Sequence, residues 1–403
     1  MNETIKRENY IEKIIPFIDK RVIKILSGIR RSGKSTIMEI VIEELYKSGV
    51  DKSQIFHAKL NTLEYEGYTS KMLLELLKSK LQSDKKTYFC LDEIQEIDGW
   101  ERAVNEIFDD SKLDVDIYLT GSNSRMLSSE ISTYLTGRYV CFEVLPLSLK
   151  EIMTFRDDLT DKYEAFDKYL ELGGFPLIHA ENMQKQSALT MVHDIYNTIV
   201  FTDIVGRNKI RNTEQLNRIV KFVFENIGKT FSAKSISDYL KSQNRKIDVE
   251  TVYNYLEKLE STYIIYRCNR YDIQGKEMLK TQEKFYLSDV ALKYCTLGYD
   301  DKAISGILEN IVYLELRRRG YDVYVGKLKN LEIDFVAEKQ GEKIYVQVAK
   351  EISKLSTQER EYENLRLIDD NYPKYVLTLN DMASGNYEGI KSMHIADWLM
   401  EEV

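Results

Sequence analysis

The stretch Gly28-Ile29-Arg30-Arg31-Ser32-Gly33-Lys34-Ser35 decides the fold of this chain. It matches the pattern G-x-x-x-x-G-K-[ST] in full, and it lies between the β-branched run Val22–Leu26 and a segment with helical periodicity. Glycines allow such a loop to turn so that successive backbone N–H groups point at a phosphate. The N-terminus of the following helix adds partial positive charge. The spacing therefore predicts a phosphate-binding loop between a strand and a helix.

The residue types in this loop suit a nucleotide with its magnesium ion. The Lys34 ammonium would reach the β- and γ-phosphates, and the Ser35 hydroxyl would complete the Mg²⁺ shell. An ordinary glycine turn is the alternative, but a chance match with the correct strand and helix on both sides is uncommon. We expect nucleotide contacts from a continuous run of residues: Gly28, Ile29, Arg30, Arg31, Ser32, Gly33, Lys34, Ser35 and Thr36.

An acidic pair follows downstream, where the apolar run Thr87–Leu91 ends in Asp92 and Glu93. Asp92 is expected beside the magnesium, and Glu93 is expected to polarise the attacking water. Two solvated acids at the end of a strand are the alternative interpretation. The pair favours a hydrolase over a switch protein, and the chain contains no Asn/Thr-Lys-x-Asp motif that would read guanine. The predicted nucleotide is therefore ATP, bound with Mg²⁺.

Two further features could complete the site. The strand-like run Val115–Thr120 leads to Ser122 and Asn123, which would come near the γ-phosphate if this strand lies between the other two. Arg138 offers a guanidinium for the negative charge that develops during phosphoryl transfer. A surface ion pair is the alternative explanation for this arginine.

Composition limits the remaining function classes. The chain has 403 residues, which predicts two or three domains. Its 57 Lys and Arg against 65 Asp and Glu exclude an overall basic coat, although a local basic patch stays possible. Four scattered cysteines and four scattered histidines predict neither a disulfide framework nor a zinc site. Because no apolar run is long enough for a membrane span or a signal peptide, we predict a cytoplasmic protein.

Predicted elements divide the chain into four parts. Strands alternate with helices in residues 1–149, which is typical of an α/β protein with a mostly parallel sheet. Residues 150–211 are mainly helical. Residues 212–290 show three helices and a β-hairpin, which is the winged-helix pattern, and residues 291–403 mix helices and strands again.

Five motifs, taken in order, resemble those of bacterial and archaeal AAA-like ATPases that carry a C-terminal domain of unknown function. The resemblance covers nearly the whole chain. It implies an AAA-type P-loop core, a helical lid, a winged helix and a C-terminal domain similar to the PD-(D/E)XK restriction-endonuclease fold. It also implies a sensor role for Ser122 and Asn123 and an arginine-finger role for Arg138. The motifs are Ser27–Thr36, Leu91–Glu96, Thr120–Ser124, Leu135–Arg138 and Leu172–Pro176.

The charges of the winged-helix pattern argue against sequence-specific DNA reading. A helix that enters the major groove should meet phosphates with Lys and Arg, but the third helix carries four acids against Lys258. We favour a structural or docking role for it. The hairpin is more basic, so contact between a DNA backbone and this wing stays open. The acids are Asp248, Glu250, Glu257 and Glu260, and the wing cations are Arg267, Arg270, Lys276, Lys280 and Lys284.

The last domain departs from the nuclease pattern. In such nucleases carboxylates hold Mg²⁺ and a lysine orients or activates water. Asp334 fits the first acid and Glu309 fits the helical glutamate, but Gln347 stands at the next acid position and Ala349 at the lysine position. Lys350 comes one residue late and would point away, because side chains of a strand alternate between faces. We predict a degenerate domain that keeps the fold for binding.

Together these features predict an ATPase whose nucleotide state repositions a winged helix and a nuclease-like domain. One alternative is an active ATP-gated DNA nuclease in defence or repair, and Ala349 argues against it. Another is a regulator that binds ATP without turnover and grips a protein partner, and the Asp92–Glu93 pair argues against that. The chain could form oligomers, and Arg138 could act within one subunit or across an interface.

Overall fold

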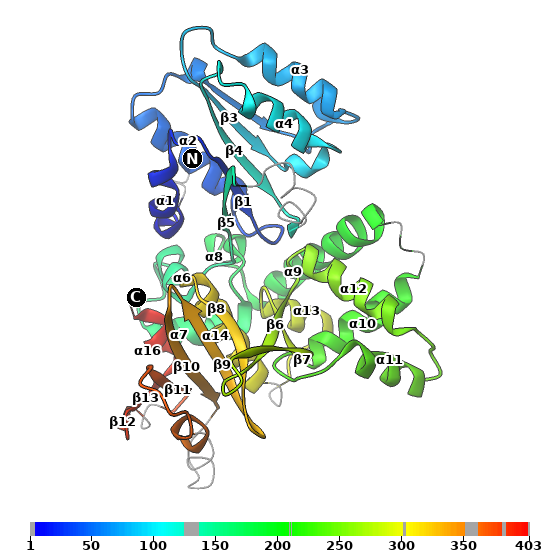
Figure 1. Cartoon of the computed structure of the whole chain (residues 1–403), viewed down its shortest axis with the longest axis vertical. Coiled ribbons are helices and arrows are strands. Elements are labelled where there is room, and N and C mark those ends of the chain that lie inside the picture. The colour runs from blue at the N-terminus through cyan, green and yellow to red at the C-terminus, as the bar shows by residue number, and fades with distance from the viewer. Residues whose placement is uncertain are drawn as a thin grey trace. The chain divides into compact units, whose positions relative to one another are not determined.

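The computed structural model describes residues 5–124, 137–208, 210, 212–300, 304–350, 362–380 and 384–401. They form two compact units, which we describe separately (Figure 1). The first comprises Met1–Pro146 with Ser261–Tyr263, and the second comprises Leu147–Glu260 with Ile264–Val403. No helix within the described ranges has both the length and the hydrophobicity of a membrane span. The cytoplasmic location stays a prediction.

In its described residues, the first unit is built on a five-stranded sheet in the order β2-β3-β4-β1-β5 (Figure 1). Every neighbouring pair is parallel, which confirms the predicted α/β core. The strand β4 lies between β1 and β3, which is the arrangement that would bring Ser122 near a γ-phosphate. The strands are β1 (Ile23–Ser27), β2 (Ile55–Lys59), β3 (Thr87–Asp92), β4 (Val115–Gly121) and β5 (Tyr139–Glu143).

Apolar residues cover both faces of this sheet. Along β3, Phe89 and Leu91 pack into one core cluster with α3 and α4, whereas Tyr88 and Cys90 pack into the other with α1 and α2. This alternation follows from the two-residue period of a strand, and burial on both faces is usual for parallel sheets. The helices are α1 (Glu8–Ile14), α2 (Lys34–Lys47), α3 (Ser70–Lys80) and α4 (Trp100–Asp109).

The second unit begins with helices. The stretch Gly173-Gly174-Phe175-Pro176 separates two helices, because α7 ends at Leu172 and α8 starts at Pro176. Gly174 is required there, since a Cβ would lie 2.5 Å from the carbonyl oxygen of Leu147. These helices are α6 (Leu149–Phe155), α7 (Lys162–Leu172), α8 (Pro176–Ala180), α9 (Lys185–Asn197), α10 (Thr213–Glu225), α11 (Ala233–Ser242), α12 (Val249–Ser261) and α13 (Ala291–Leu297).

The described part of the second unit also contains an eight-stranded sheet in the order β12-β13-β11-β10-β9-β8-β6-β7 (Figure 1). Helices α14 (Ile304–Arg318) and α16 (Ile395–Met400) belong to this unit. The strands are β6 (Ile265–Asp272), β7 (Glu277–Leu287), β8 (Asp322–Leu328), β9 (Leu331–Lys339), β10 (Glu342–Ala349), β11 (Lys374–Thr378), β12 (Gly385–Tyr387) and β13 (Ile390–His394).

The winged-helix prediction is not confirmed, and the sheet shows how its hairpin pairs. The three helices and the β6–β7 hairpin form where they were predicted, but β6 also pairs in parallel with β8, with Arg270 opposite Val325. The hairpin is therefore the edge of the C-terminal sheet rather than a separate wing. The place of the hairpin in the sheet depends on backbone pairing between residues more than 50 positions apart. The local sequence pattern of the hairpin does not predict that pairing. The predicted boundary at residue 290 cuts through the sheet.

Candidate active site

The phosphate-binding loop leaves the carboxyl end of β1 and enters α2, as predicted. Gly28 has a φ of +149°, and a Cβ at this position would lie 2.3 Å from the backbone oxygen of Val144. Gly33 has a φ of +97° and caps the N-terminus of α2. Because residues with a Cβ atom rarely adopt such backbone conformations, the path of the backbone requires glycine at both positions. Ile29 and Ser32 are buried at the base of the loop.

Lys34 lies inside this loop. Its Nζ donates to the carbonyl oxygens of Gly28 and Ile29, each at 3.0 Å, and the residue is only 3% exposed. Both of these acceptors are neutral, and the charge of Lys34 also lowers the pKa of Glu93. The remaining predicted contact residues are less buried: Arg30 and Ser35 are half-buried, and Arg31 and Thr36 are exposed.

The two predicted acids lie where β3 ends. The hydroxyl of Thr120 donates to Asp92 Oδ1 and accepts from the backbone N of Glu93 at 2.9 Å. Thr120 therefore ties the metal-ligand candidate to the water-polarising candidate. Sequence reasoning missed this residue, although its position at the end of the strand between the two motifs was a usable signal. Glu93 itself has a left-handed backbone with a φ of +56°.

The carboxylate of Glu93 is held in an ionised state. Its Oε2 accepts from the Gln95 amide and from the Ser122 hydroxyl, the latter at 3.3 Å. Burial alone would raise the pKa of this carboxyl, but Lys34 and these hydrogen bonds outweigh burial and hold the pKa below its ordinary value. A low pKa keeps the group able to accept a hydrogen bond from water at neutral pH. Gln95 is a second residue that the sequence analysis did not single out.

The carboxyl ends of parallel strands meet at one edge of a sheet, and here that edge collects the loop, the acids and the β4 terminus. Ser122 contacts Glu93, so the strand order brings together residues almost 30 positions apart. Asn123 follows Ser122 directly at the same edge. Their predicted proximity to a γ-phosphate stays a prediction.

Arg138 lies at the end of the sheet where β1 begins, opposite the end that carries the phosphate loop. Its carbonyl accepts from the backbone N of Ile23 at 2.8 Å, at the start of β1. The phosphate loop follows the end of β1, about 16 Å away at about 3.3 Å per residue. The guanidinium contacts α4, at 2.6 Å from Asn105 Oδ1 and 2.8 Å from Asp109 Oδ2. These contacts agree with the surface ion pair that was the alternative explanation, and an arginine-finger role, within one subunit or across an interface, stays a prediction. Residues 135 and 136 of the quoted motif lie outside the described part.

The predicted wing cations are engaged inside the second unit. Arg267 Nε donates to Glu260 Oε1 at 2.7 Å, and Arg270 donates to Gln282 at 2.8 Å. Lys284 is buried among carboxylates. The side chain of Lys280 lies outside the described residues, and Lys276 is exposed at the turn. Contact between a DNA backbone and Arg267 or Lys284 would therefore have to break internal ion pairs.

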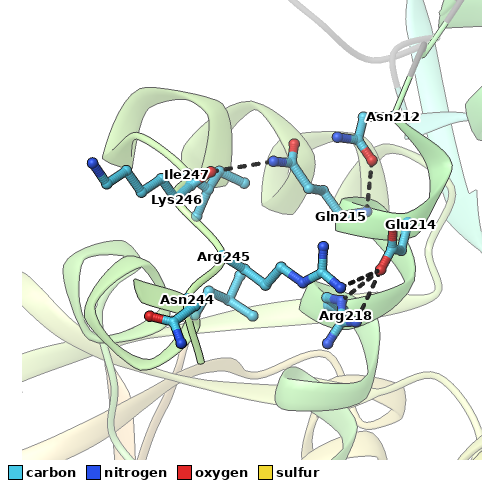
Figure 2. A pocket seen from close by; sticks show the side chains of 9 residues that line it. Asn212, Glu214, Gln215, Arg218, Asn244, Arg245, Lys246 and Ile247 are labelled. Carbon is cyan, nitrogen blue, oxygen red and sulfur yellow. Dashed lines mark hydrogen bonds and ion pairs between the residues drawn. The ribbon is translucent and has the colours of Figure 1, made fainter. Parts of the chain in front are cut away.

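A polar pocket of about 240 Å³ lies where α10 faces the connection from α11 to α12 (Figure 2). Figure 2 shows Arg218 and Arg245 converging on Glu214, at 2.9 and 3.7 Å. This acid offsets part of the positive charge, so the pocket is a weaker candidate for a phosphate than the loop around Lys34. Its lining residues are Asn212, Glu214, Gln215, Arg218, Leu240, Asn244, Arg245, Lys246 and Ile247.

Comparison with known proteins agrees with this geometry. Residues 20–153 match the family described as AAA domain, and residues 163–303 match a domain of unknown function, DUF8612. An uncharacterized protein of Haemophilus influenzae is 36% identical over 406 residues, covering 98% of this chain and 99% of that protein. An uncharacterized protein of Methanocaldococcus jannaschii is 29% identical over 408 residues, covering 96% and 86%.

Among solved structures, a Walker-type ATPase of Pyrococcus abyssi matches with a TM-score of 0.52. The match covers 72% of this chain and 95% of that chain, at 16% sequence identity. At this identity the likeness concerns the fold alone. It agrees with the parallel-sheet core and the phosphate loop, while the nuclease-like fold of the C-terminal domain stays unconfirmed.

Proposed function

This chain belongs to the same family as the Haemophilus influenzae relative and carries an AAA domain, and we propose on that premise that it binds and hydrolyses ATP with Mg²⁺. One observation carries the proposal: Lys34, Asp92 and Glu93 meet at one edge of a parallel sheet, around a loop that has the backbone of a phosphate cradle.

The side chains fit these roles. Lys34 would exchange its carbonyl partners for phosphate oxygens, which are stronger, charged acceptors. Asp92 and Ser35 supply the carboxylate and hydroxyl oxygens that suit Mg²⁺, which when bound would neutralise charge on the β- and γ-phosphates. Glu93, ionised and held by Gln95 and Ser122, would orient and polarise the attacking water.

Substitution of Glu93 tests hydrolysis directly. Glu93→Gln keeps the shape but removes the charge, so it should bind ATP normally while turnover falls by about 10²-fold or more. Calorimetry measures binding, and phosphate release measures turnover. Ordinary turnover in this variant would overturn the role of Glu93. An inactive wild type with normal ATP binding would instead favour the regulator that binds without turnover.

We also propose that the nucleotide state repositions the second unit. Buried Arg7 supports a connection, because its guanidinium donates to the Ser32 carbonyl of the loop at 2.8 Å and to the Pro146 carbonyl at 3.5 Å. The chain enters the second unit at the next residue, Leu147, whose N–H donates to Gly174 at 2.7 Å. Movement of the loop would thereby reach the Gly-Gly turn.

A protein partner fits the second unit better than sequence-specific DNA binding. Acids predominate in α12, and Arg267 is paired with Glu260. Turnover should therefore change little when single- or double-stranded DNA is added to the purified protein. Stimulation by DNA, lost when Arg245 and Lys246 are replaced by Ala, would instead favour DNA binding near the pocket of Figure 2.

A further inference from the structure

A buried lysine occupies the centre of the acid cluster in the second unit. Lys284 of β7 has its Nζ 2.9 Å from Glu309 Oε2, 2.9 Å from Glu332 Oε1 and 3.3 Å from Asp334 Oδ1. Its side chain is 2% exposed. Glu309 comes from α14, and the other two acids come from β9. The hairpin that was predicted as a wing thus delivers a cation to the residues that were predicted as metal ligands.

The other atoms of this cluster are also engaged. Asp334 Oδ2 accepts from the backbone N of Val348 at 2.9 Å, and Glu309 Oε2 accepts from the Tyr286 hydroxyl at 3.1 Å. The Gln347 side-chain oxygen accepts from the backbone N of Asp334 at 3.2 Å. At least one oxygen of each carboxylate in the cluster therefore already has a protein partner.

The charges explain why a lysine is stable in this position. Burying carboxylates without a counter-ion is very costly, and one ammonium among them removes most of that cost. Burial would lower the pKa of Lys284, but Asp334, Glu309 and Glu332 outweigh it and raise this pKa, so the lysine stays charged. Burial and the charge of Asp334 raise the pKa of Glu309, whereas Lys284 lowers it.

We propose that Lys284 Nζ is the resident cation of this cluster, in the place of a divalent metal, and that removing it opens a site for Mg²⁺ or Mn²⁺. The residues present do not fit a bound metal ion, because the ammonium lies between Glu309 and Asp334. Among the described residues, no group of three or more potential metal ligands forms a metal site. This inference is independent of ATP hydrolysis by the first unit.

Lys284 does not replace the lysine that the motif lacks at Ala349. An ammonium has three N–H donors, and within the described residues three carboxylates surround it at 2.9–3.3 Å. The ammonium donates hydrogen bonds to Glu309 Oε2 and Asp334 Oδ1 and pairs with Glu332, so carboxylates already hold it. Ala349 is 8% exposed, and Lys350 is exposed but follows the last residue of β10, so the predicted alternation along the strand does not apply to it.

Metal rescue of a lysine variant tests the proposal. Without nucleotide, Mn²⁺ should leave the wild-type melting temperature within about 1 °C, whereas Lys284→Ala should melt about 5–10 °C lower and regain several degrees with Mn²⁺. Adding Asp334→Asn should abolish the regain, and Lys221→Ala, at an exposed lysine of α10, should behave as the wild type. A folded Lys284→Ala that gains nothing from Mn²⁺ would overturn the proposal.

A direct measurement keeps the test decisive if Lys284→Ala fails to fold. Electron paramagnetic resonance counts Mn²⁺ bound to the nucleotide-free wild type and to Asp334→Asn. Equal, negligible binding in both proteins is the expected result. A Mn²⁺ site in the wild type that Asp334→Asn removes would show that a metal displaces Lys284, and would overturn the proposal.

Discussion

Two buried lysines of this protein have opposite surroundings. Lys34 is 3% exposed and donates to two backbone carbonyls in the phosphate loop. Lys284 is 2% exposed and lies among three carboxylates of the described second unit. Both side chains are ordered, but their acceptors differ in charge.

That difference in acceptors determines what each lysine can do. Neutral carbonyls orient an ammonium and leave its charge to attract an incoming anion. Carboxylates neutralise the ammonium, so it stabilises the fold and cannot attract a phosphate. A lysine in a motif is therefore no sufficient sign of an active site. The groups that hold it distinguish a binding residue from a structural one.

The largest expected effect concerns the arginine that would join Lys34 at the phosphate. Because Arg138 lies at the far edge of its own sheet, we predict that it completes the site of a neighbouring copy. Arg138→Ala should lower kcat by roughly 10³-fold with little change in ATP affinity. Mixing it with Lys34→Ala should restore some turnover in steady-state assays, because one mixed interface would contain both residues. Absence of recovery, together with a monomer in light scattering, would contradict this role.

We predict that loss of Lys34 affects ATP binding and loss of Lys284 affects stability. Lys34→Ala should weaken ATP binding by about 100-fold or more, since a charged hydrogen-bond donor is lost, while the melting temperature changes little. Lys284→Ala should reduce the free energy of unfolding by about 3–5 kcal/mol, because buried carboxylates lose their counter-ion, while ATP affinity per folded molecule is kept. Calorimetric titration and thermal unfolding of both variants measure the two properties. If either lysine affected both equally, the distinction would fail.

A smaller effect is expected from the residue that positions both acids. Thr120→Val keeps the volume but removes the hydroxyl between Asp92 and Glu93. We expect kcat to fall about tenfold at unchanged ATP affinity, which corresponds to the loss of one or two hydrogen bonds. Thr120→Ser should retain turnover, and a Ser variant as slow as the Val variant would indicate a packing role instead.

The smallest effect concerns pH. The pKa of Glu93 lies below 4.5, its ordinary value, so the carboxylate stays ionised as pH falls from 8 to 6. We predict that titration of Glu93 changes kcat by less than about twofold over this range, because protonation of this carboxyl would begin only at lower pH. A pH–rate profile of the wild type checks this. An acidic limb near pH 6 that shifts in Glu93→Asp would contradict the assigned low pKa.

Several features were predictable because their signals are local. The loop from Gly28 to Ser35 needs glycines at particular backbone positions, and the period of apolar residues distinguishes its strand from its helix. The break before Pro176 is equally local. The position of β4 between β1 and β3 differs from these, because the motifs left it as a condition and only the strand order establishes it.

Other features depended on which distant segments pair. The place of Arg138 follows from the register of β5 against β1, and the fate of the hairpin follows from the pairing of β6 with β8. Neither register can be predicted from the local sequence pattern, because a strand with a given alternation of apolar and polar residues can pair with many partners. The sequence analysis therefore assigned the hairpin to a wing and left the reach of Arg138 open.

The sequence by itself determined the nucleotide loop, the acids that follow it and the loss of the nuclease lysine at Ala349. These conclusions rest on residue type and short spacing, which the chain carries directly. Only the tertiary structure decided that Thr120 joins Asp92 to Glu93 and that Lys284 fills the acid cluster. The physical reason is that Coulomb and hydrogen-bond interactions depend on distance in space, and folding brings together groups that lie 25 to 50 residues apart.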